Sequence, residues 1–172
     1  MTIGAFTGAV MGLTTGNGWI AFLCAGLAGA LFGLIHAYAC ISCHADQTIA
    51  GTAINFLGPG LALFLCKAMY NNSSDTPAMD PSCKLPKLFE GVFPTGSFWN
   101  NVLNVYAVAY LVFVLAFVCW FVFYKTKFGA HLRAVGEHPE ACESLGIDVY
   151  KVRYTCVILS GFLAGLGGGF VT

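Results

Sequence analysis

The sequence predicts an all-α protein, a polytopic bundle of transmembrane helices with about five hydrophobic segments. Composition is the first reason: 58% of the 172 residues are hydrophobic and 9% are charged, against roughly 25% charged residues in an ordinary soluble domain. The second is that several apolar runs reach the roughly 20 residues that a helix needs to cross a bilayer. The third is one charged stretch, residues 125–153, which holds nine of the sixteen Asp, Glu, Lys and Arg residues and separates two apolar runs.

The first apolar run, residues 1–13, is too short to span about 30 Å of hydrocarbon. It lacks the basic start of a removable signal peptide. Its glycines, Gly4, Gly8 and Gly12, recur on one helix face, as in closely packed helices. Because the last apolar run continues to Thr172, we expect the sequence to be a fragment with both ends inside the membrane.

The second apolar run, residues 19–41, follows a turn at residues 14–18 and is long enough to span. Gly29 and Gly33 stand in a GxxxG relation, and small residues at this spacing let two helices approach closely. Packing of this face against lipid is the open alternative. Residues 42–47 form a short polar link to the next run.

The third run, residues 48–70, contains Asn55 and a proline between two glycines, Pro59. Because proline removes a helix hydrogen bond, we expect a kink or break near residues 56–58. Backbone groups freed in this way must face protein or a water-filled cavity. Asn55, Phe56 and Pro59 are therefore candidate residues of a substrate pathway, although helix bonding would also satisfy the Asn55 amide.

The remaining runs flank the charged stretch. Residues 72–101 are polar and rich in proline, as in an aqueous loop. Residues 102–124 are the clearest membrane helix, with Trp120 and Tyr124 placed as interfacial anchors. Residues 154–172 form the last apolar run.

The charged stretch is expected to form a structured loop around one short helix. Pro139 suits the first helical position, where its missing N–H costs nothing. Gly146 suits the left-handed residue that follows a helix end. Glu140 and Glu143 complement the positive end of the helix dipole.

Lysine and arginine counts predict the orientation. Five of these residues lie in the charged stretch and two lie in residues 72–101. The positive-inside rule therefore places the charged stretch in the cytoplasm and the polar loop outside. The link at residues 42–47 then lies inside and the turn at residues 14–18 outside.

The polar link carries a C-x-x-C-H pattern, Cys40, Cys43 and His44, which is typical of c-type haem attachment. The predicted topology places it on the cytoplasmic side, whereas such haem is attached on the outer side, and no second Cys-x-x-Cys pair would complete a zinc site. We expect no metal or cofactor on this chain. Asp46 is expected to cap the following helix.

Composition and motifs also exclude several classes. A net charge of zero gives no electrostatic footprint for nucleic acid. No nucleophile with an oriented base is apparent, so we expect no enzyme. No G-x-x-x-x-G-K-[ST] pattern occurs, so any ATP would bind to another chain.

The charged stretch and the run after it carry a family resemblance. LRAVGEHPEACESLGIDVYKVRY, followed by LSGFLAGLGG, resembles the coupling loop and next membrane helix of bacterial ABC-importer permeases of the branched-chain amino acid, ribose and nucleoside class. It is most similar to the permeases for nucleosides and simple sugars. The earlier segment ADQTIAGTAINFLGPGLALFL is also similar to these permeases, whereas His138 and Cys142 depart from the family pattern.

The resemblance implies that residues 1–172 are part of a transmembrane permease domain of an ATP-driven importer for nucleosides or simple sugars, in the bacterial inner membrane. Residues 125–153 would be the coupling loop, which faces cytoplasmic ATP-binding subunits. A second permease subunit, an extracytoplasmic substrate-binding protein and membrane lipid are the other implied partners. The implied ATPase-coupling residues are Arg133, Gly136, Glu137, His138, Pro139, Glu140 and Gly146.

Other functions remain open on sequence grounds. Within the same family, the chain could serve a permease for branched-chain amino acids or ribose. From other classes, the alternatives are a haem-bearing membrane electron carrier and a channel-like multispan protein that needs no ATPase.

Overall fold

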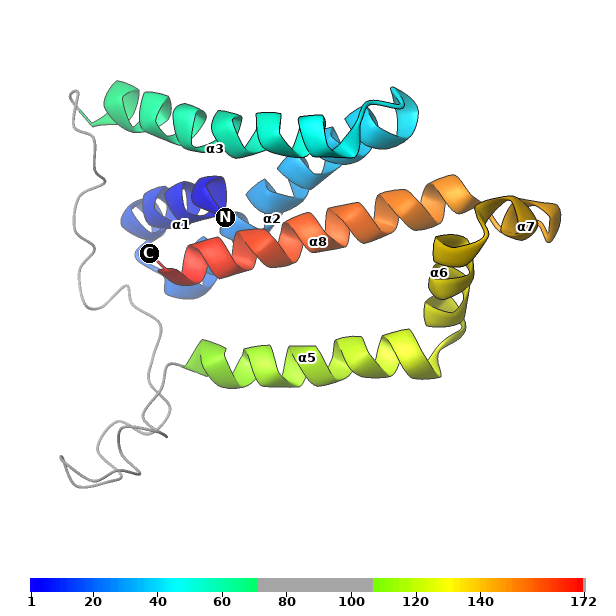
Figure 1. The fold of residues 1–172 in the computed structure, drawn as a ribbon. Helices are drawn as coiled ribbons and strands as arrows, with labels where there is room; N and C mark the ends of the chain where they lie inside the picture. The colour runs from blue at the N-terminus through cyan, green and yellow to red at the C-terminus, as the bar shows by residue number, and fades with distance from the viewer. Residues whose placement is uncertain (71–106, 172) are drawn as a thin grey trace. The chain divides into compact units, whose positions relative to one another are not determined.

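The computed structural model describes residues 1–70 and 107–171, and within these ranges the regular structure is helical without strands (Figure 1). Contacts divide the chain into two units, which we describe separately. The first unit contains α1, α2, η1, α3 and α8, and the second contains α5, α6 and α7. The elements are α1 (Thr2–Thr15), α2 (Gly18–Ala37), the π-helical turn η1 (Tyr38–Ser42), α3 (Gln47–Met69), α5 (Ala107–Lys125), α6 (Lys127–Glu137), α7 (Pro139–Ser144) and α8 (Val149–Val171).

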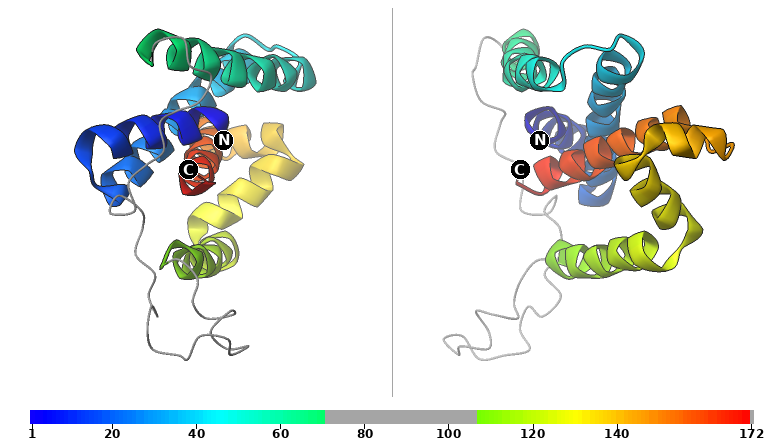
Figure 2. Two further views of the ribbon diagram at one scale, coloured as in Figure 1. Left: turned by 90° about the vertical axis from the view of Figure 1, so that its left-hand side faces the viewer. Right: turned by 45° about the vertical axis from the view of Figure 1, so that its right-hand side comes forward.

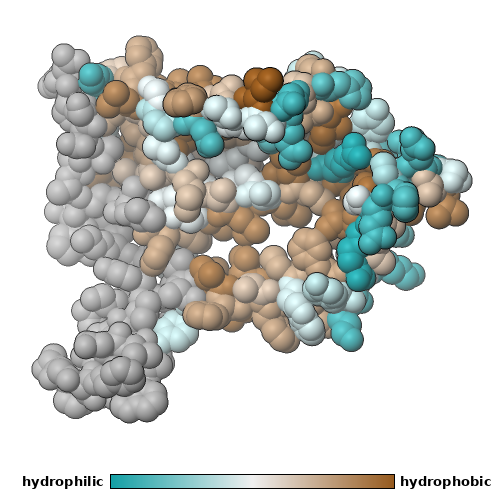
Figure 3. Space-filling model, in the orientation of Figure 1, coloured by the Kyte–Doolittle hydropathy of each residue, from teal (hydrophilic) through white to brown (hydrophobic). Residues whose placement is uncertain are grey.

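Three described helical segments are long and apolar enough to cross a membrane: Gly18–Ser42, Gln47–Met69 and Val149–Phe170. A fourth span results if Tyr110–Lys125 and Lys127–Glu137, which are bent by 72° at their junction, count as one. Apolar side chains cover much of α3 and α5, whereas polar residues gather over α6 and α7 (Figure 3). The all-α, multi-pass membrane class predicted from the sequence is therefore confirmed.

The first unit is built on a close contact between α2 and α8, which cross each other in the right-hand view of Figure 2. A Cβ atom added to Gly161 would lie 2.6 Å from the carbonyl oxygen of Gly29 and 2.9 Å from the Cα atom of Gly33. One added to Gly165 would lie 2.9 Å from the Cα atom of Gly29. The two backbones are therefore in direct contact, which confirms the predicted packing role of Gly29 and Gly33.

Helix α1 packs on this pair through its own glycines. Gly4, Gly8 and Gly12 are all buried, and a Cβ atom on Gly4 would lie 2.9 Å from the Cα atom of Gly165. The helix ends at Gly16, which has a φ of 65° and donates its N–H to the carbonyl of Gly12. The glycine face predicted for the first apolar run is thus a packing face.

Helix α3 begins at a side-chain cap and runs without a break through Pro59. The Asp46 carboxylate accepts hydrogen bonds from the N–H groups of Thr48 and Ile49, at 2.8 and 3.2 Å, which confirms the predicted cap. These backbone hydrogen bonds, Ile49 first, hold the pKa of Asp46 below its ordinary value. Of the predicted kink or break near residues 56–58, the break is wrong, because α3 stays helical on both sides of Pro59. Membrane helices accept a proline where neighbouring groups or small local adjustments satisfy the carbonyl that it frees.

The second unit contains a helix where the sequence predicts a loop. Helix α6 fills residues 127–137, where charge density suggests a loop, and Thr126 caps it by accepting the N–H of Gly129 at 3.3 Å. Its apolar residues Phe128, Leu132 and Val135 recur at helical spacing, so one face is apolar. Part of the charged stretch is therefore helical rather than a loop.

The bounds of the later elements differ from those expected. Helix α5 is described from Ala107, within the predicted helix at residues 102–124, and the predicted aqueous loop at residues 72–101 lies outside the described residues. Helix α8 begins at Val149 rather than at residue 154. Asp148 explains the earlier start, because its carboxylate accepts the N–H of Lys151 at 3.1 Å and caps the helix.

Candidate functional sites

The first candidate site is the short helix α7 in the second unit. Pro139 is its first residue, and Gly146 follows its end with a φ of 79°, as predicted. The turn closes through two hydrogen bonds, from the N–H of Gly146 to the Glu143 carbonyl at 3.0 Å and from the N–H of Ile147 to the Cys142 carbonyl at 3.0 Å. A proline start and a glycine stop therefore fix both ends of α7.

Burial on α7 separates an anchored side from a free side. Cys142 is 3% exposed, and Val135 on the neighbouring α6 is 4% exposed. Leu145, at the end of α7, is 78% exposed. Of the predicted coupling residues Pro139 is half-buried, and the exposed ones are Arg133, Gly136, Glu137, His138, Glu140 and Gly146. Helix α7 thus presents a polar surface with one apolar side chain at its end.

Arg133 links α6 to the end of α5. Its guanidinium carbon lies 5.4 Å from the centre of the Tyr124 ring, and its Nε donates to the carbonyl of Gly129 at 3.4 Å. A cation over an aromatic face is an attractive contact. Tyr124 was expected as an interfacial anchor, so this pairing adds a residue to the predicted set. The Arg133 side chain thus connects α6 with the last turn of α5.

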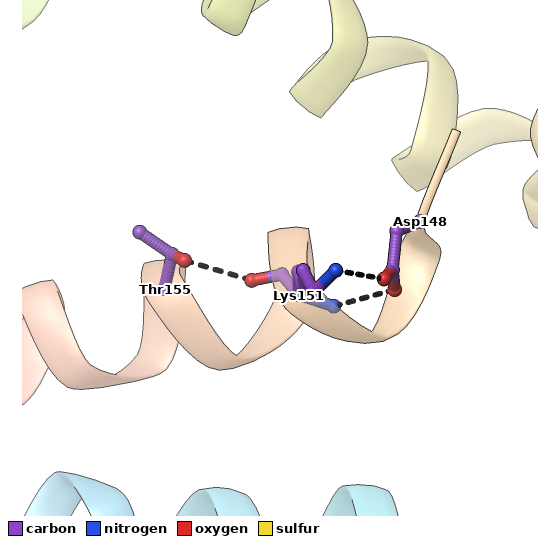
Figure 4. A network of polar contacts seen from close by, with 3 residues as sticks. All are labelled: Asp148, Lys151 and Thr155. Atoms are coloured by element: carbon purple, nitrogen blue, oxygen red, sulfur yellow. Dashed lines mark hydrogen bonds and ion pairs between the residues drawn. The ribbon is translucent and has the colours of Figure 1, made fainter. Parts of the chain in front are cut away.

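A polar network stands at the start of α8 (Figure 4). The Lys151 ammonium lies 2.9 Å from the Asp148 carboxylate, and Thr155 donates its hydroxyl to the carbonyl of Lys151 at 2.7 Å. The hydrogen bond from the Lys151 side chain, followed by that from its backbone, lowers the pKa of Asp148. Both side chains are exposed, so this pair orders the helix start and contributes little to stability.

The second candidate site is a cavity of about 410 Å³ in the first unit. Its wall is built from α1, α2, α3 and α8 and consists of Met1, Thr2, Ile3, Gly4, Gly29, Phe32, Gly33, His36, Gly51, Ile54, Asn55, Gly58, Pro59, Val157, Ser160, Gly161 and Ala164. The exposed state of Asn55, Pro59 and Ser160 shows that the cavity opens to the surface of this unit.

The structure brings two of the three predicted pathway residues to this cavity. Asn55 and Pro59 lie in the wall, whereas Phe56 is absent from it and is 77% exposed. One residue along a helix turns the side chain by about 100°, so Phe56 leaves the face that Asn55 occupies. His36 and Ser160 were not singled out as site residues. Their positions beside the packing glycines could have identified them in the sequence, since His36 follows Gly33 by three residues and Ser160 precedes Gly161.

The C-x-x-C-H pattern is not gathered into one site. The Sγ atom of Cys40 lies 3.8 Å from both ring nitrogens of His36, which is outside the pattern. Cys43 is exposed, and His44 has a φ of 52° in the link before α3. Among the described residues, no three His, Cys, Asp or Glu side chains are arranged to hold a metal ion.

The family model and the two relatives described next are all transport permeases. The protein-family model described as "Branched-chain amino acid transport system / permease component" matches residues 1–172. The chain is 44% identical over 178 residues to the guanosine ABC transporter permease protein NupQ of Bacillus subtilis, and the match covers 98% of this chain and 54% of that protein. It is 36% identical over 174 residues to the nucleoside ABC transporter permease protein NupC of Lactococcus lactis, and this match covers 98% of this chain and 54% of that protein.

A shorter match extends to a sugar permease. Over 69 residues the chain is 32% identical to the fructose import permease protein FrcC of Rhizobium meliloti, a match that covers 40% of this chain and 19% of that protein. The chain spans about half the length of the two nucleoside permeases. No solved structure matches it significantly.

Proposed function

The chain belongs to the permease family of branched-chain amino acid transport systems, and we propose that it is part of the membrane permease subunit of an ATP-driven importer for nucleosides or simple sugars. In this proposal the chain carries solute across the bilayer and catalyses no reaction. A partner chain binds and hydrolyses ATP, and no cofactor resides on this chain.

One observation carries the choice of substrate. The 44% identity to the guanosine permease extends over 98% of the chain and so includes both candidate sites. The match to the fructose permease keeps simple sugars in the proposal. Permeases for branched-chain amino acids or ribose are the second candidate, since the description of the matching family names branched-chain amino acids.

Helix α7 would be the coupling element, within a coupling loop at residues 125–153. Its capped ends make it short and stiff, and the buried Cys142 holds one side in place. The exposed side chains of His138 and Glu140, together with Leu145, would meet a groove on the ATP-binding subunit. Closure of the ATP-binding subunits would then move α7 as a body and transmit the movement through residues 146–148 to α8.

The proposal includes a topology and an assembly. Five hydrophobic segments, which are α1, α2 with η1, α3, α5 and α8, would lie in the bacterial inner membrane, with the charged stretch in the cytoplasm. Exposed apolar side chains such as Leu27 and Phe64 would contact lipid or a second permease subunit. An extracytoplasmic binding protein would deliver the solute.

Uptake by the assembled importer tests this function. The permease that contains this chain is expressed with its ATP-binding subunit and binding protein in a bacterial strain that lacks nucleoside uptake. We expect ATP-dependent accumulation of labelled guanosine, competed by unlabelled nucleosides, with fructose as the second solute assayed. Accumulation of leucine without guanosine or fructose would replace this proposal with the amino acid alternative.

A further inference from the structure

The cavity of the first unit collects polar side chains from separate membrane helices. His36 comes from α2, Asn55 from α3 and Ser160 from α8, and all three lie in its wall. Asn55 is the ninth residue of the span Gln47–Met69, and Ser160 is the twelfth residue of the span Val149–Phe170. Both therefore lie toward the middle of their spans, where polar groups are rare and costly.

Two of these side chains have no protein partner in the described part of the chain. Neither the Asn55 amide nor the Ser160 hydroxyl makes a hydrogen bond within residues 1–70 and 107–171. Within the same residues the His36 ring has one polar contact, with the Cys40 thiol at 3.8 Å. An unsatisfied amide in an apolar span costs free energy unless a ligand, water or another helix bonds to it. Their convergence on one cavity points to a ligand.

The wall also restricts the charge of that ligand. Among the described residues that form it, no Asp, Glu, Lys or Arg occurs. A zwitterionic amino acid would find no charged side chain there to pair with its ammonium and carboxylate, which is unfavourable away from water. Histidine, asparagine and serine can each both donate and accept hydrogen bonds, and this suits hydroxyl and ring-nitrogen groups. Phe32 adds a flat apolar surface, and a volume of about 410 Å³ accommodates a small solute.

We propose that His36, Asn55 and Ser160 form a binding site for a neutral, hydroxyl-rich solute, and that His36 determines its specificity. This inference rests on the proposed function and deepens it, because it assigns the solute contacts to named side chains and excludes zwitterions. His36 holds this role because its ring is the largest polar group of the three and adjoins the π-helical turn η1. Such turns interrupt regular helices and occur often at functional sites.

The test uses the whole importer in proteoliposomes, with saturating binding protein, and measures guanosine imported per ATP hydrolysed. The variants are Asn55→Leu, Ser160→Ala, His36→Leu and His36→Gln. Loss of one solute hydrogen bond should lower the import ratio about tenfold in the first three variants. His36→Gln, which keeps a donor and an acceptor, should recover most of the ratio. ATP hydrolysis stimulated by the binding protein should persist, because α7 is untouched.

Neighbouring residues on the same helices provide matched controls outside the cavity wall. They are Ile35→Ala on α2, Leu57→Ala on α3 and Leu159→Ala on α8, all exposed apolar side chains in the wild type. These variants should import guanosine at the wild-type ratio. Equal losses in the wall and control variants would overturn the site, as would unchanged ratios in all the wall variants.

Failure of the function and failure of the site give different results. Wild-type importer that carries neither guanosine nor fructose would refute the proposed function itself. Wild-type importer that carries guanosine while the wall variants match it would refute the site alone. Preference of the wild type for leucine over guanosine would refute the exclusion of zwitterions.

Discussion

Single glycines fix how closely the helices of the first unit approach. Gly161 faces the backbone of Gly29 and Gly33, so a methyl group there would meet the Gly29 carbonyl oxygen at 2.6 Å. Gly161→Ala should destabilise the protein by about 1–3 kcal/mol, because main-chain atoms cannot rotate out of the way as a side chain can. Thermal unfolding of the purified permease in detergent measures this loss.

Gly60 on α3 is the matched control for that substitution. A Cβ atom there would meet nothing within 4 Å. Gly60→Ala should therefore stabilise α3 by roughly 0.5–1 kcal/mol, since alanine loses less backbone freedom than glycine. If Gly60→Ala lowers the unfolding temperature as much as Gly161→Ala does, the loss at position 161 cannot be attributed to contact with the α2 backbone.

The cap at Asp46 gives α3 a dependence on pH. Hydrogen bonds from the backbone of Ile49 and Thr48 hold the pKa of this carboxyl below its ordinary value of 3.8. A lowered pKa in the folded state means that the capping contribution is complete above the ordinary value. It is lost as the pH falls through the lower, folded-state pKa.

Asp46→Ala should accordingly lower the unfolding temperature at pH 7, and the difference from wild type should shrink below pH 3.8. Asp46→Asn is the control, because it still caps the helix but carries no titrating proton. If the wild type keeps the same excess in unfolding temperature over Asp46→Ala at the lowest pH, the charge of Asp46 does not contribute to the stability that the cap provides.

At the scale of elements, α7 depends on the backbone conformation of the residue that ends it. Gly146 has a φ of 79°, a region that β-branched residues avoid. We expect Gly146→Val to abolish stimulation of ATP hydrolysis while membrane insertion stays normal. Gly146→Asn should retain much of it, since asparagine tolerates this conformation. Insertion is followed by immunoblot of membranes and coupling by ATPase assay; full stimulation in Gly146→Val would contradict a coupling role for α7.

Helices α5 and α6 meet at a bend of 72°, and the Arg133 guanidinium on α6 lies over the Tyr124 ring on α5. A double-mutant cycle with Arg133→Gln and Tyr124→Leu should yield a coupling energy of about 0.5–1 kcal/mol in thermal unfolding. Strictly additive single effects would mean that the two side chains are neighbours without interaction. Phe117 and Trp120, whose ring centres lie 5.8 Å apart on α5, offer an independent pair for comparison.

At the scale of the whole molecule, the predicted topology sets which residues face the cytoplasm. Leu145→Cys, at an exposed end of α7, should react with a membrane-impermeant maleimide in inverted vesicles and not in intact cells. Thr15→Cys, at the end of α1, should behave in the opposite way. A variant without the native cysteines provides the background. Labelling of position 145 in intact cells would reverse the orientation.

Much of this fold could be predicted because its signals are local. Apolar run length predicts the spans, and the four-residue spacing of Gly29 and Gly33 predicts a packing face. Proline and glycine predict both ends of α7. These features depend on one segment each, so no knowledge of the neighbouring helices is needed.

The features that were not predicted depend on how a residue packs against other parts of the structure. Charge density alone predicts a loop at residues 127–137, whereas the spacing of Phe128, Leu132 and Val135 carries the helical signal. Pro59 predicts a break by its chemistry, yet the uninterrupted α3 accommodates it. His36 enters the cavity wall only because α3 and α8 supply Asn55 and Ser160 across from it, and one sequence does not show that meeting.

Where Gly29 and Gly33 of α2 meet Gly161 and Gly165 of α8, the two backbones touch with no side chain between them that could change rotamer. Two helices packed in this way move as one rigid body, so a displacement of one end of α8 also displaces α2 by the same amount. Relative movement within the first unit is then left to α3, whose capped start follows the non-helical link at residues 43–46. The opening of the cavity beside Asn55 would therefore widen and narrow through a movement of α3 relative to the rigid pair of α2 and α8.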